Sequence, residues 1–558
     1  MKDRYSAKIA DHAADYGRAS MSPDKEKLGK VRIFDTTGRD GMQMPNAFET
    51  ERTGKTVMQN KYGIAMRLAR WGIPIIEVGN AVSSTEEEEV IRRVGQEVKE
   101  LGLGTEIVSL ARMVRGDIDA ARRSKADTLH IFTSGSVPHV WVKFGKTPGE
   151  LIPNIVEMTK YGKSVGFKRI IVSLEDSVRA DPDHLVEVAR RIRDIGVDGA
   201  GGVDIRMNIP DTVGVADPAY MFALIRYIKA QCGDMPLQVH CHNDMGRAVD
   251  NTLAAIYAGA SEFHATMHGM GERTGNASLE QILVNLRVRH GIELIDTTNI
   301  ASVSRFIQER SGVKPAVGAP VVGRNSFNHE AGVHGDAVRK CQVSGFSARG
   351  GPDAGSVYAA YDPTLVGAKE TIGVGPLCGK ANVKAHLEDF GVQVPDGKVA
   401  GIVTSVKEWT SERRISDADF ILMAYREVND KICERISYVK STASSTSDGG
   451  EANVSLWFEG STHEATAAGN GPVDAAVKAI RTALGTSNIE ISSYESESMG
   501  SGSDAKARVT ITVRKNGDSI ESSVVGPDTV RTAIDAFVKG YNALCALEEL
   551  RAAQPETA

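Results

Sequence analysis

Eight short apolar segments alternate with helical patterns between residues 31 and 267. The apolar, β-rich segments cover residues 31–35, 73–78, 105–110, 128–132, 169–174, 204–209, 236–240 and 262–267. Eight strands alternating with helices over about 250 residues are typical of a (β/α)8 barrel, which we place at residues 31–296. A doubly wound open sheet is the alternative, but a glycine-rich phosphate loop would then follow the first strand. The chain has Thr-Thr-Gly-Arg-Asp-Gly there, which favours the barrel.

A barrel places its chemistry at the C-terminal ends of its strands, and polar residues cluster there in this sequence. The seventh strand ends in His240 and His242, which point the same way because side chains two apart share a face of a strand. Two such imidazoles suit a divalent metal, although a histidine pair alone is more often satisfied by backbone groups. The concentration of ionisable groups at one rim therefore indicates a catalytic mouth.

The remainder of the chain changes character twice. A helical or loose leader is expected at residues 1–30, and helices with long loops at residues 297–440. Within the latter, Asn-His-Glu-Ala-Gly-Val-His-Gly-Asp at 328–336 has the composition of a lid segment. Residues 441–451 are polar and glycine-bearing, which predicts a linker. Residues 441–548 then form an α+β module of two strand-and-helix units, suited to binding an effector, to dimerisation or to stabilisation.

Composition narrows the class of protein. The formal net charge of −6 and the isoelectric point near 6.2 argue against a nucleic-acid partner. No run of about 18 apolar residues predicts a membrane span, and the polar start lacks a signal-peptide core. The six cysteines are scattered without a Cys-x-x-Cys pair, as expected for reduced thiols in a cytoplasmic protein.

Four motifs carry a resemblance to a known family. They are Asp-Thr-Thr-Gly-Arg-Asp-Gly-Met-Gln at 35–43, Asn-Ile-Pro-Asp-Thr-Val-Gly at 208–214, His-Cys-His-Asn-Asp-Met-Gly at 240–246 and Gly-Met-Gly-Glu-Arg-Thr-Gly-Asn at 269–276. With them the chain resembles the α-isopropylmalate synthase and homocitrate synthase family, acetyl-CoA-dependent relatives of 3-hydroxy-3-methylglutaryl-CoA lyase. The C-terminal module, with Gly-Asn-Gly-Pro-Val-Asp-Ala-Ala at 469–476, looks like the regulatory domain of isopropylmalate and citramalate synthases.

The resemblance implies a role for eleven residues. The metal ligands fall on Asp40, His240, His242 and Asn276, the catalytic groups on Arg39, Glu175, His334 and Tyr358, and the substrate-binding groups on His130, Ser173 and Thr212. It implies a divalent metal (Mg, Mn or Zn), acetyl-CoA as co-substrate and a 2-oxo acid, with 2-oxoisovalerate as the favoured acid. A homodimer and a leucine effector at the C-terminal module are implied as well.

Several positions depart from the family pattern and keep the substrate open. Met42 replaces an acidic or amide residue of many relatives, His268 replaces an asparagine, and Cys378 opens a changed loop motif. Pyruvate, as in citramalate synthesis, and the homocitrate synthase reaction therefore stay as alternatives. A carbon–carbon lyase and a non-catalytic amino-acid sensor are further alternatives, which the complete ligand set and the C-terminal module disfavour.

Overall fold

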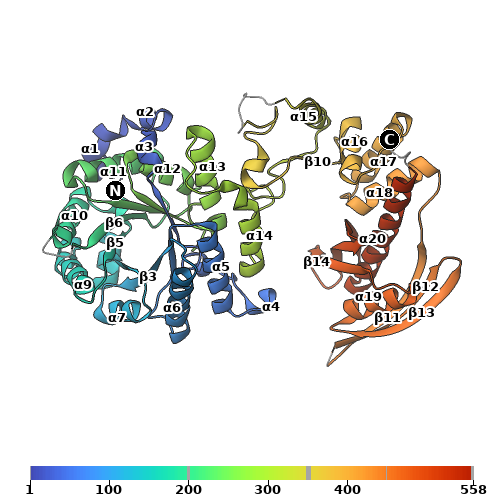
Figure 1. The fold of residues 1–558 in the computed structure, drawn as a ribbon, viewed down its shortest axis with the longest axis horizontal. Helices are drawn as coiled ribbons and strands as arrows, with labels where there is room; N and C mark the ends of the chain where they lie inside the picture. The colour runs from blue at the N-terminus through green and yellow to red at the C-terminus, as the bar shows by residue number, and fades with distance from the viewer. Residues whose placement is uncertain (1, 198–201, 347–353, 448, 554–558) are drawn as a thin grey trace. The chain divides into compact units, whose positions relative to one another are not determined.

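The computed structural model describes residues 2–197, 202–346, 354–447 and 449–553. The chain forms two compact units, each with its own core (Figure 1). The first unit is Met1–Phe327 with Tyr361–Lys369, and the second is Asn328–Ala360 with Glu370–Ala558. Within the described residues, no helix has the length and apolar character needed to cross a membrane.

The first unit is built on a closed barrel of eight parallel strands, as the sequence predicts. Each strand pairs with the next in sequence, and β8 closes the ring by pairing Arg32 of β1 with Glu262. The strands are β1 (Arg32–Asp35), β2 (Ile75–Gly79), β3 (Glu106–Arg112), β4 (Thr128–Ser134), β5 (Arg169–Glu175), β6 (Asp204–Asp211), β7 (Leu237–Cys241) and β8 (Glu262–Ala265).

Helices follow the strands and surround them (Figure 1). They are α5 (Val57–Trp71), α6 (Thr85–Glu100), α7 (Arg115–Arg123), α8 (Val137–Phe144), α9 (Ile152–Ser164), α10 (Pro182–Val197), α11 (Pro218–Cys232), α12 (Ala248–Ala258) and α13 (Leu279–His290), with α4 (Thr50–Thr53) before α5 and α14 (Ile300–Ser311) after α13. Local sequence fixes their ends. In α5, Thr56 and Gln59 form a capping box, and Gly72 ends the helix in the left-handed conformation.

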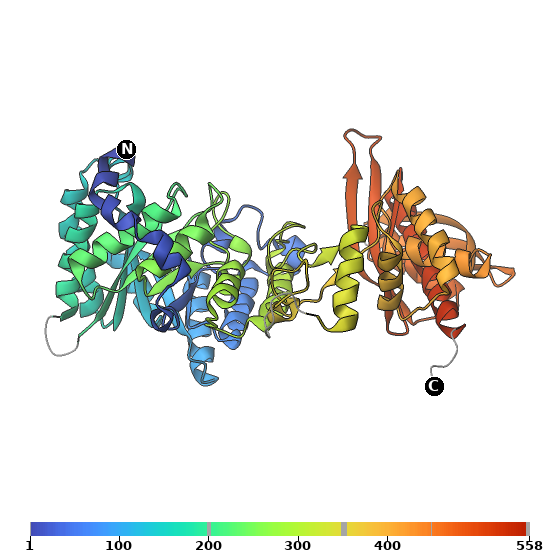
Figure 2. The ribbon, with the colours of Figure 1, turned by 90° about the horizontal axis from the view of Figure 1, so that it is seen from above.

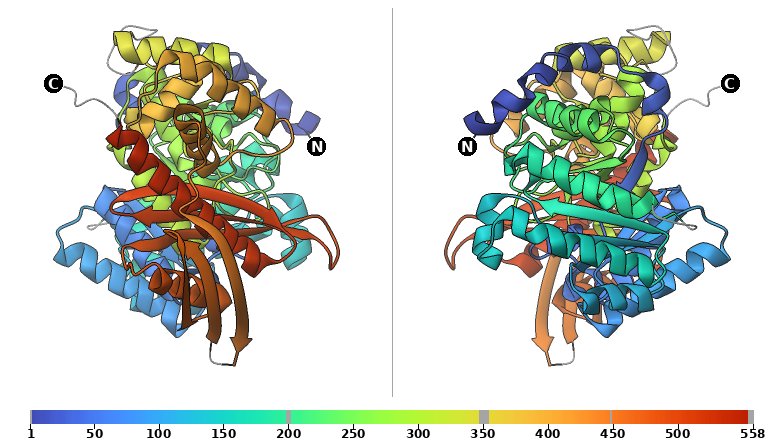
Figure 3. Two further views of the ribbon diagram at one scale, coloured as in Figure 1. Left: turned by 90° about the vertical axis from the view of Figure 1, so that its right-hand side faces the viewer. Right: turned by 90° about the vertical axis from the view of Figure 1, so that its left-hand side faces the viewer.

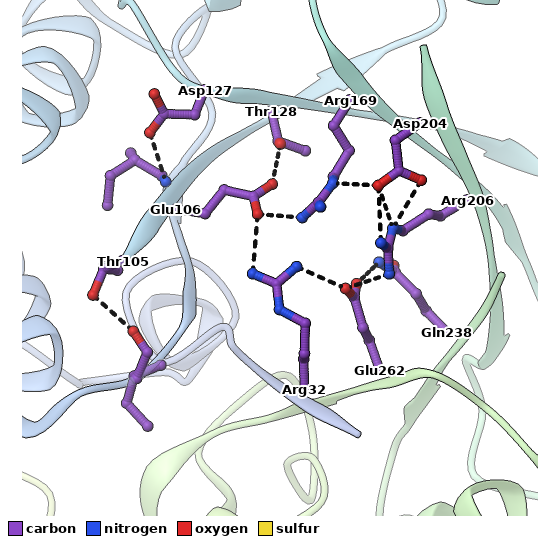
Figure 4. Close-up of polar contacts among 12 residues, drawn as sticks. Arg32, Thr105, Glu106, Asp127, Thr128, Arg169, Asp204, Arg206, Gln238 and Glu262 are labelled. Carbon is purple, nitrogen blue, oxygen red and sulfur yellow. Dashed lines mark hydrogen bonds and ion pairs between the residues drawn. The ribbon is translucent and has the colours of Figure 1, made fainter. Parts of the chain in front are cut away.

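The barrel interior is layered. At the N-terminal ends of the strands, alternating charges form a connected network (Figure 4). Its members are Arg32, Glu106, Arg169, Asp204, Arg206, Gln238 and Glu262. Above it lies an apolar layer of Phe34, Ile75, Val108 and Ile171. These two layers close one end of the barrel, so the polar groups at the opposite end line its mouth.

The N-terminal residues are helical and pack on the barrel. They form α1 (Lys2–Ala13), α2 (Tyr16–Met21) and α3 (Lys25–Leu28). Figure 2 shows α1 lying along the outer helices, where it packs on α11. Ile9 is buried, and Lys8 Nζ lies 3.0 Å from Asp181 Oδ1. The leader is therefore part of the barrel unit.

The second unit begins with a short parallel pair and continues with helices and two antiparallel sheets. Its elements are β9 (Asn328–His329), α15 (Gly332–Ser344), β10 (Thr371–Ile372), α16 (Lys380–Asp389), α17 (Asp396–Thr410), α18 (Asp417–Asn429), β11 (Ile436–Thr446), β12 (Gly449–Phe458), β13 (Ser461–Gly469), α19 (Pro472–Ala483), β14 (Ile489–Met499), β15 (Lys506–Lys515), β16 (Asp518–Gly526) and α20 (Thr529–Ala552). The sheets have the orders β11-β12-β13 and β14-β15-β16.

One hydrophobic core joins the helices and both sheets of the second unit. The long helix α20 packs on β15, β16 and α18, and α19 packs on β12 and β13 (Figure 3). The predicted linker at residues 441–451 is wrong, because β11 and β12 pair through this segment from Thr446 and Gly449 inward. Serines and threonines fill most of the β11 part of this segment, and a strand with one solvent-facing side tolerates such polar residues. Residue 448 lies outside the described residues.

Candidate active site at the barrel mouth

The four predicted metal ligands come together at the mouth of the barrel. Asp40 follows β1, His240 belongs to β7, and His242 and Asn276 lie in the loops after β7 and β8. An isolated bridge pairs His242 with Asn276, so the backbone holds the two loops together. All four side chains are at least nine-tenths buried.

The donor atoms of these side chains converge. His240 Nε2 lies 3.2 Å from His242 Nε2 and 3.6 Å from Asp40 Oδ2. Two nitrogens that each lie about 2.1 Å from one ion, about 100° apart, would stand about 3.2 Å from each other. Asp40 Oδ2 and Asn276 Oδ1 are buried without a hydrogen-bond partner. Buried polar atoms normally have partners, so this donor set fits a cation.

The two imidazoles are in the form that binds metals. Burial lowers the pKa of His240 well below its ordinary value, and the neighbouring His242 lowers it further. Burial, followed by Arg273 and Arg39, lowers the pKa of His242 to about 4. Both rings are therefore neutral near pH 7, with lone pairs available for coordination.

The acid and imidazole ligands do not form a metal site by themselves. In the part of the chain that is described, no group of three or more histidine, cysteine, aspartate or glutamate side chains is arranged to hold a metal ion. Arg39 Nη1 donates to Asp40 Oδ1, which leaves Oδ2 of that carboxylate for the imidazoles. The fourth donor is an amide oxygen, which belongs to none of those residue types.

Arg39 is held by a buried carboxylate for which the sequence predicted no role. Arg39 Nε donates to Glu77 Oε2 at 2.6 Å, and His130 Nδ1 lies 2.6 Å from Glu77 Oε1. A carboxylate can only accept here, so His130 carries its proton on Nδ1. Burial alone would raise the pKa of Glu77, but Arg39 and then His130 outweigh it and hold this pKa well below its usual range. Glu77 thus fixes both predicted site residues.

The predicted substrate-binding residues line the same mouth. Ser173 Oγ accepts a hydrogen bond of 2.7 Å from Asn208 Nδ2, and both side chains are buried. Thr212 Oγ1 accepts from the backbone N–H of Asp176 at 2.8 Å. Glu175, at the end of β5, accepts from Lys143 Nζ at 2.6 Å. The barrel therefore brings together nine of the eleven predicted residues.

His334 and Tyr358 belong to the second unit, where they lie together. Their rings stack with centroids 3.9 Å apart, and His329 lies near both. Both side chains are exposed. Asn382 fixes the segment before His334, because its amide donates to the carbonyl oxygens of Glu330 and Gly373 at 3.0 and 2.9 Å.

Two further site residues, Glu77 and Asn208, are polar residues at predicted strand ends to which the sequence assigns no role. Glu77 interrupts the apolar strand Ile-Ile-Glu-Val, and Asn208 lies in Arg-Met-Asn-Ile-Pro. A charged or amide side chain inside a buried strand needs a partner, which is a signal for a polar barrel interior. Their particular partners depend on which strands become neighbours, so the pairing required the fold.

A closed barrel of eight parallel strands, with acid, amide and imidazole donors clustered at its mouth, is the arrangement of a metal-binding (β/α)8-barrel enzyme. Three family descriptions match the sequence: HMGL-like over residues 30–307, Homocitrate synthase post-HMGL domain-like over 321–414, and LeuA allosteric (dimerisation) domain over 414–545. Together they cover the barrel, the helical region and the C-terminal module.

Full-length relatives narrow the family. A probable 2-isopropylmalate synthase of Methanopyrus kandleri is 35% identical, covering 92% of this chain and 98% of its own length. A 2-isopropylmalate synthase and an (R)-citramalate synthase of Methanocaldococcus jannaschii are 34% and 33% identical, covering 93% and 92% of this chain and 96% and 99% of their own lengths. The chain belongs to the 2-isopropylmalate synthase and citramalate synthase family of acyltransferases.

Proposed function

We propose that the protein is a metal-dependent acyltransferase that condenses acetyl-CoA with a 2-oxo acid and releases CoA. The observation that carries the proposal is the approach of the His240 ring nitrogen to that of His242 and to the unpartnered Oδ2 of Asp40. The unpartnered amide oxygen of Asn276 belongs to a residue that a backbone bridge pairs with His242. 2-Oxoisovalerate is the favoured acid. Pyruvate is the second candidate, because relatives named for citramalate synthesis match this chain almost as well as those named for 2-isopropylmalate synthesis.

Asp40, His240, His242 and Asn276 would hold the cation. Oxygen and imidazole donors without thiolates suit Mg, Mn or Zn with positions left open. Such a cation, when bound, supplies a Lewis acid that polarises a keto group.

The neighbouring side chains would orient the 2-oxo acid. Arg39 is fixed by Glu77 and would donate to the keto oxygen as it gains charge during carbon–carbon bond formation. The Thr212 hydroxyl accepts one hydrogen bond and keeps its own hydrogen, which it would donate to the acid's carboxylate. His130 and Ser173 would line the pocket for the acid's side chain.

The condensation also requires proton transfer. His334, with Glu175 as its acid/base partner, would remove a proton from the methyl group of acetyl-CoA. The resulting carbon attacks the keto carbon, the keto oxygen takes up a proton, and water then cleaves the thioester to give free CoA. Tyr358 stacks on His334 and would keep its ring in place. We further propose a homodimer with leucine as effector at the LeuA-type domain.

The test is thiol release from acetyl-CoA by the metal-loaded protein with 2-oxoisovalerate, pyruvate, 2-oxoglutarate, oxaloacetate or glyoxylate. Release with 2-oxoisovalerate is expected, and His242→Ala should abolish it together with most of the bound metal. His463→Ala is the matched control, because His463 is on β13 and contacts Ser461. No release with any acid would reject the proposal and favour a carbon–carbon lyase or a sensor.

A further inference from the structure

A second cavity lies on the outside of the barrel, between α5, α6 and α14. Helix α5 packs on both α6 and α14, and Figure 1 shows it between them. The cavity has a volume of about 630 Å³, within the usual range for sites that bind small molecules. It contains none of the residues of the barrel mouth.

The wall of this cavity has an excess of positive charge. Five cationic side chains line it, against two carboxylates: Lys55, Arg67, Arg70, Arg93 and Arg310 with Glu89 and Glu97. The whole chain has a net charge of −6, so this wall is unlike the protein's average surface. Local charge of one sign in a concave site attracts ions of the opposite sign.

Of these five cations, the two carboxylates pair with Arg70 alone. Glu97 pairs with Arg70 at 2.9 Å, and Glu89 pairs with Arg92, which does not line the cavity. Arg67 contacts the hydroxyl of Ser302 at 2.8 Å. Within the described residues, Arg67 has no carboxylate partner.

Arg310 and Arg93 are likewise held by aromatic rings instead of carboxylates. The Arg310 guanidinium lies 5.0 Å from the centre of the Phe306 ring, and that of Arg93 lies 4.1 Å from the Tyr62 ring. Arg67 and Arg310 are half-buried. Arginines that are partly withdrawn from water normally pair with anions. Because Arg67 and Arg310 have no carboxylate partner among the described residues, their guanidinium groups remain available to an anionic ligand.

We propose that this cavity binds a nucleotide-type polyanion, in which phosphate groups are joined to an aromatic base. The guanidinium groups suit phosphate oxygens, which they bind in pairs. Tyr62 and Phe306, with Met58 and Met66, give the same wall an apolar part for the base. An inorganic phosphate would fill a small part of the volume and leave that apolar wall in water. The proposal is independent of the reaction at the barrel mouth.

Calorimetric titration of the full chain with ADP tests this site without any turnover. We expect a dissociation constant below about 1 mM at moderate salt, weakening as salt rises. Arg67→Gln and Arg310→Gln should each weaken ADP binding about tenfold or more, as loss of a charged hydrogen bond does. Arg123→Gln, on α7 and paired with Glu88, removes the same charge elsewhere and should bind like the unaltered protein.

Further arms identify the ligand's source. Pyrophosphate should bind more weakly than ADP, because it lacks the base. Displacement of ADP by CoA would assign the cavity to the nucleotide end of CoA, and lack of displacement to a separate nucleotide; both support the proposal. Absence of ADP binding, or equal binding by the three variants, would overturn it. If the unaltered protein does not bind ADP and the Arg67 and Arg310 variants lose the proposed dimer, this wall would be a subunit contact, which would also overturn the proposal.

Discussion

Replacing Glu77 by glutamine should loosen the barrel mouth from within. Glu77 is fully buried and accepts hydrogen bonds of 2.6 Å from both Arg39 and His130. Glutamine has nearly the same shape but no charge, so the change removes the ionic part of both contacts while filling the same space. Arg39 keeps its contact with Asp40.

The size of the effect follows from the ion pair with Arg39. Charge centres about 4 Å apart in an effective dielectric of about 20 attract by about 4 kcal/mol. Arg39 would lose that attraction, but glutamine avoids part of the cost of burying a carboxylate. We therefore expect the local free energy of opening to fall by about 2–3 kcal/mol.

The loss should depend on pH with a definite sign. The folded pKa of Glu77 lies below the ordinary value of 4.5, so its charge stabilises the fold above about pH 4.5. That contribution fades as the pH falls further. The unaltered protein and Glu77→Gln should thus differ most near neutral pH and converge in acid.

Hydrogen exchange read by mass spectrometry suits this test, because a chain of two units need not unfold in one step. Amides of β2 and β4 should exchange about 30- to 150-fold faster in Glu77→Gln at pH 7. Glu88→Gln removes a partly exposed pair with Arg123 and should change exchange less than about fivefold. Unchanged protection of β2 and β4, or a difference that grows in acid, would refute the reasoning.

Three other changes should have measurable effects. Burial raises the pKa of Asp35 to about 7, so the free energy of unfolding should fall by up to about 4 kcal/mol as the pH rises from about 4 to 7. Asp35→Asn, which keeps its contacts with Thr37, should flatten this pH dependence of the urea midpoint. An unchanged slope would contradict this. Asn382→Ala removes three buried hydrogen bonds and should speed amide exchange over residues 328–346, whereas equal protection would mean that this segment is held elsewhere. Removing residues 441–558 should give an aggregating chain instead of a clean loss of leucine inhibition, as light scattering can check; a monodisperse, folded product would contradict the shared core.

The barrel was predictable because its signal is repeated eight times. A strand buried on both faces must be almost wholly apolar, as Ile-Ile-Val-Ser-Leu in β5 is, and amphipathic helices lie between the strands, with a capping box at the start of α5. An error in the prediction of one strand or helix does not change the number of repeats enough to suggest another fold. The charged network at the closed end was not predicted, because Arg32, Glu106 and Glu262 meet only when β1, β3 and β8 take their places in the ring.

The candidate site likewise has a part that the sequence predicts and a part that only the fold shows. Motifs at strand ends located Asp40, His240 and Asn276, since parallel strands bring their C-terminal ends to one rim. The supporting contacts were not readable, because Glu77 reaches Arg39 and His130 across separate strands. Residue type at a strand end predicts which groups gather at the mouth; the neighbour relations of the strands decide which of them hold one another.

Composition misled at residues 441–451 for a physical reason that also governs how the chain can be cut. Serine, threonine and glycine mark a linker when nothing pairs with their backbone, but here β11 and β12 satisfy that backbone in a ladder. Across the expected boundary, Lys539 of α20 lies 2.8 Å from Asp419 of α18, and Tyr425 donates to Glu549 at 2.5 Å. Because α18 and α20 bury their apolar faces against each other, the helices before residue 441 lack a complete core of their own. The effector binding that we propose for the C-terminal module should therefore be tested with single substitutions on the intact chain.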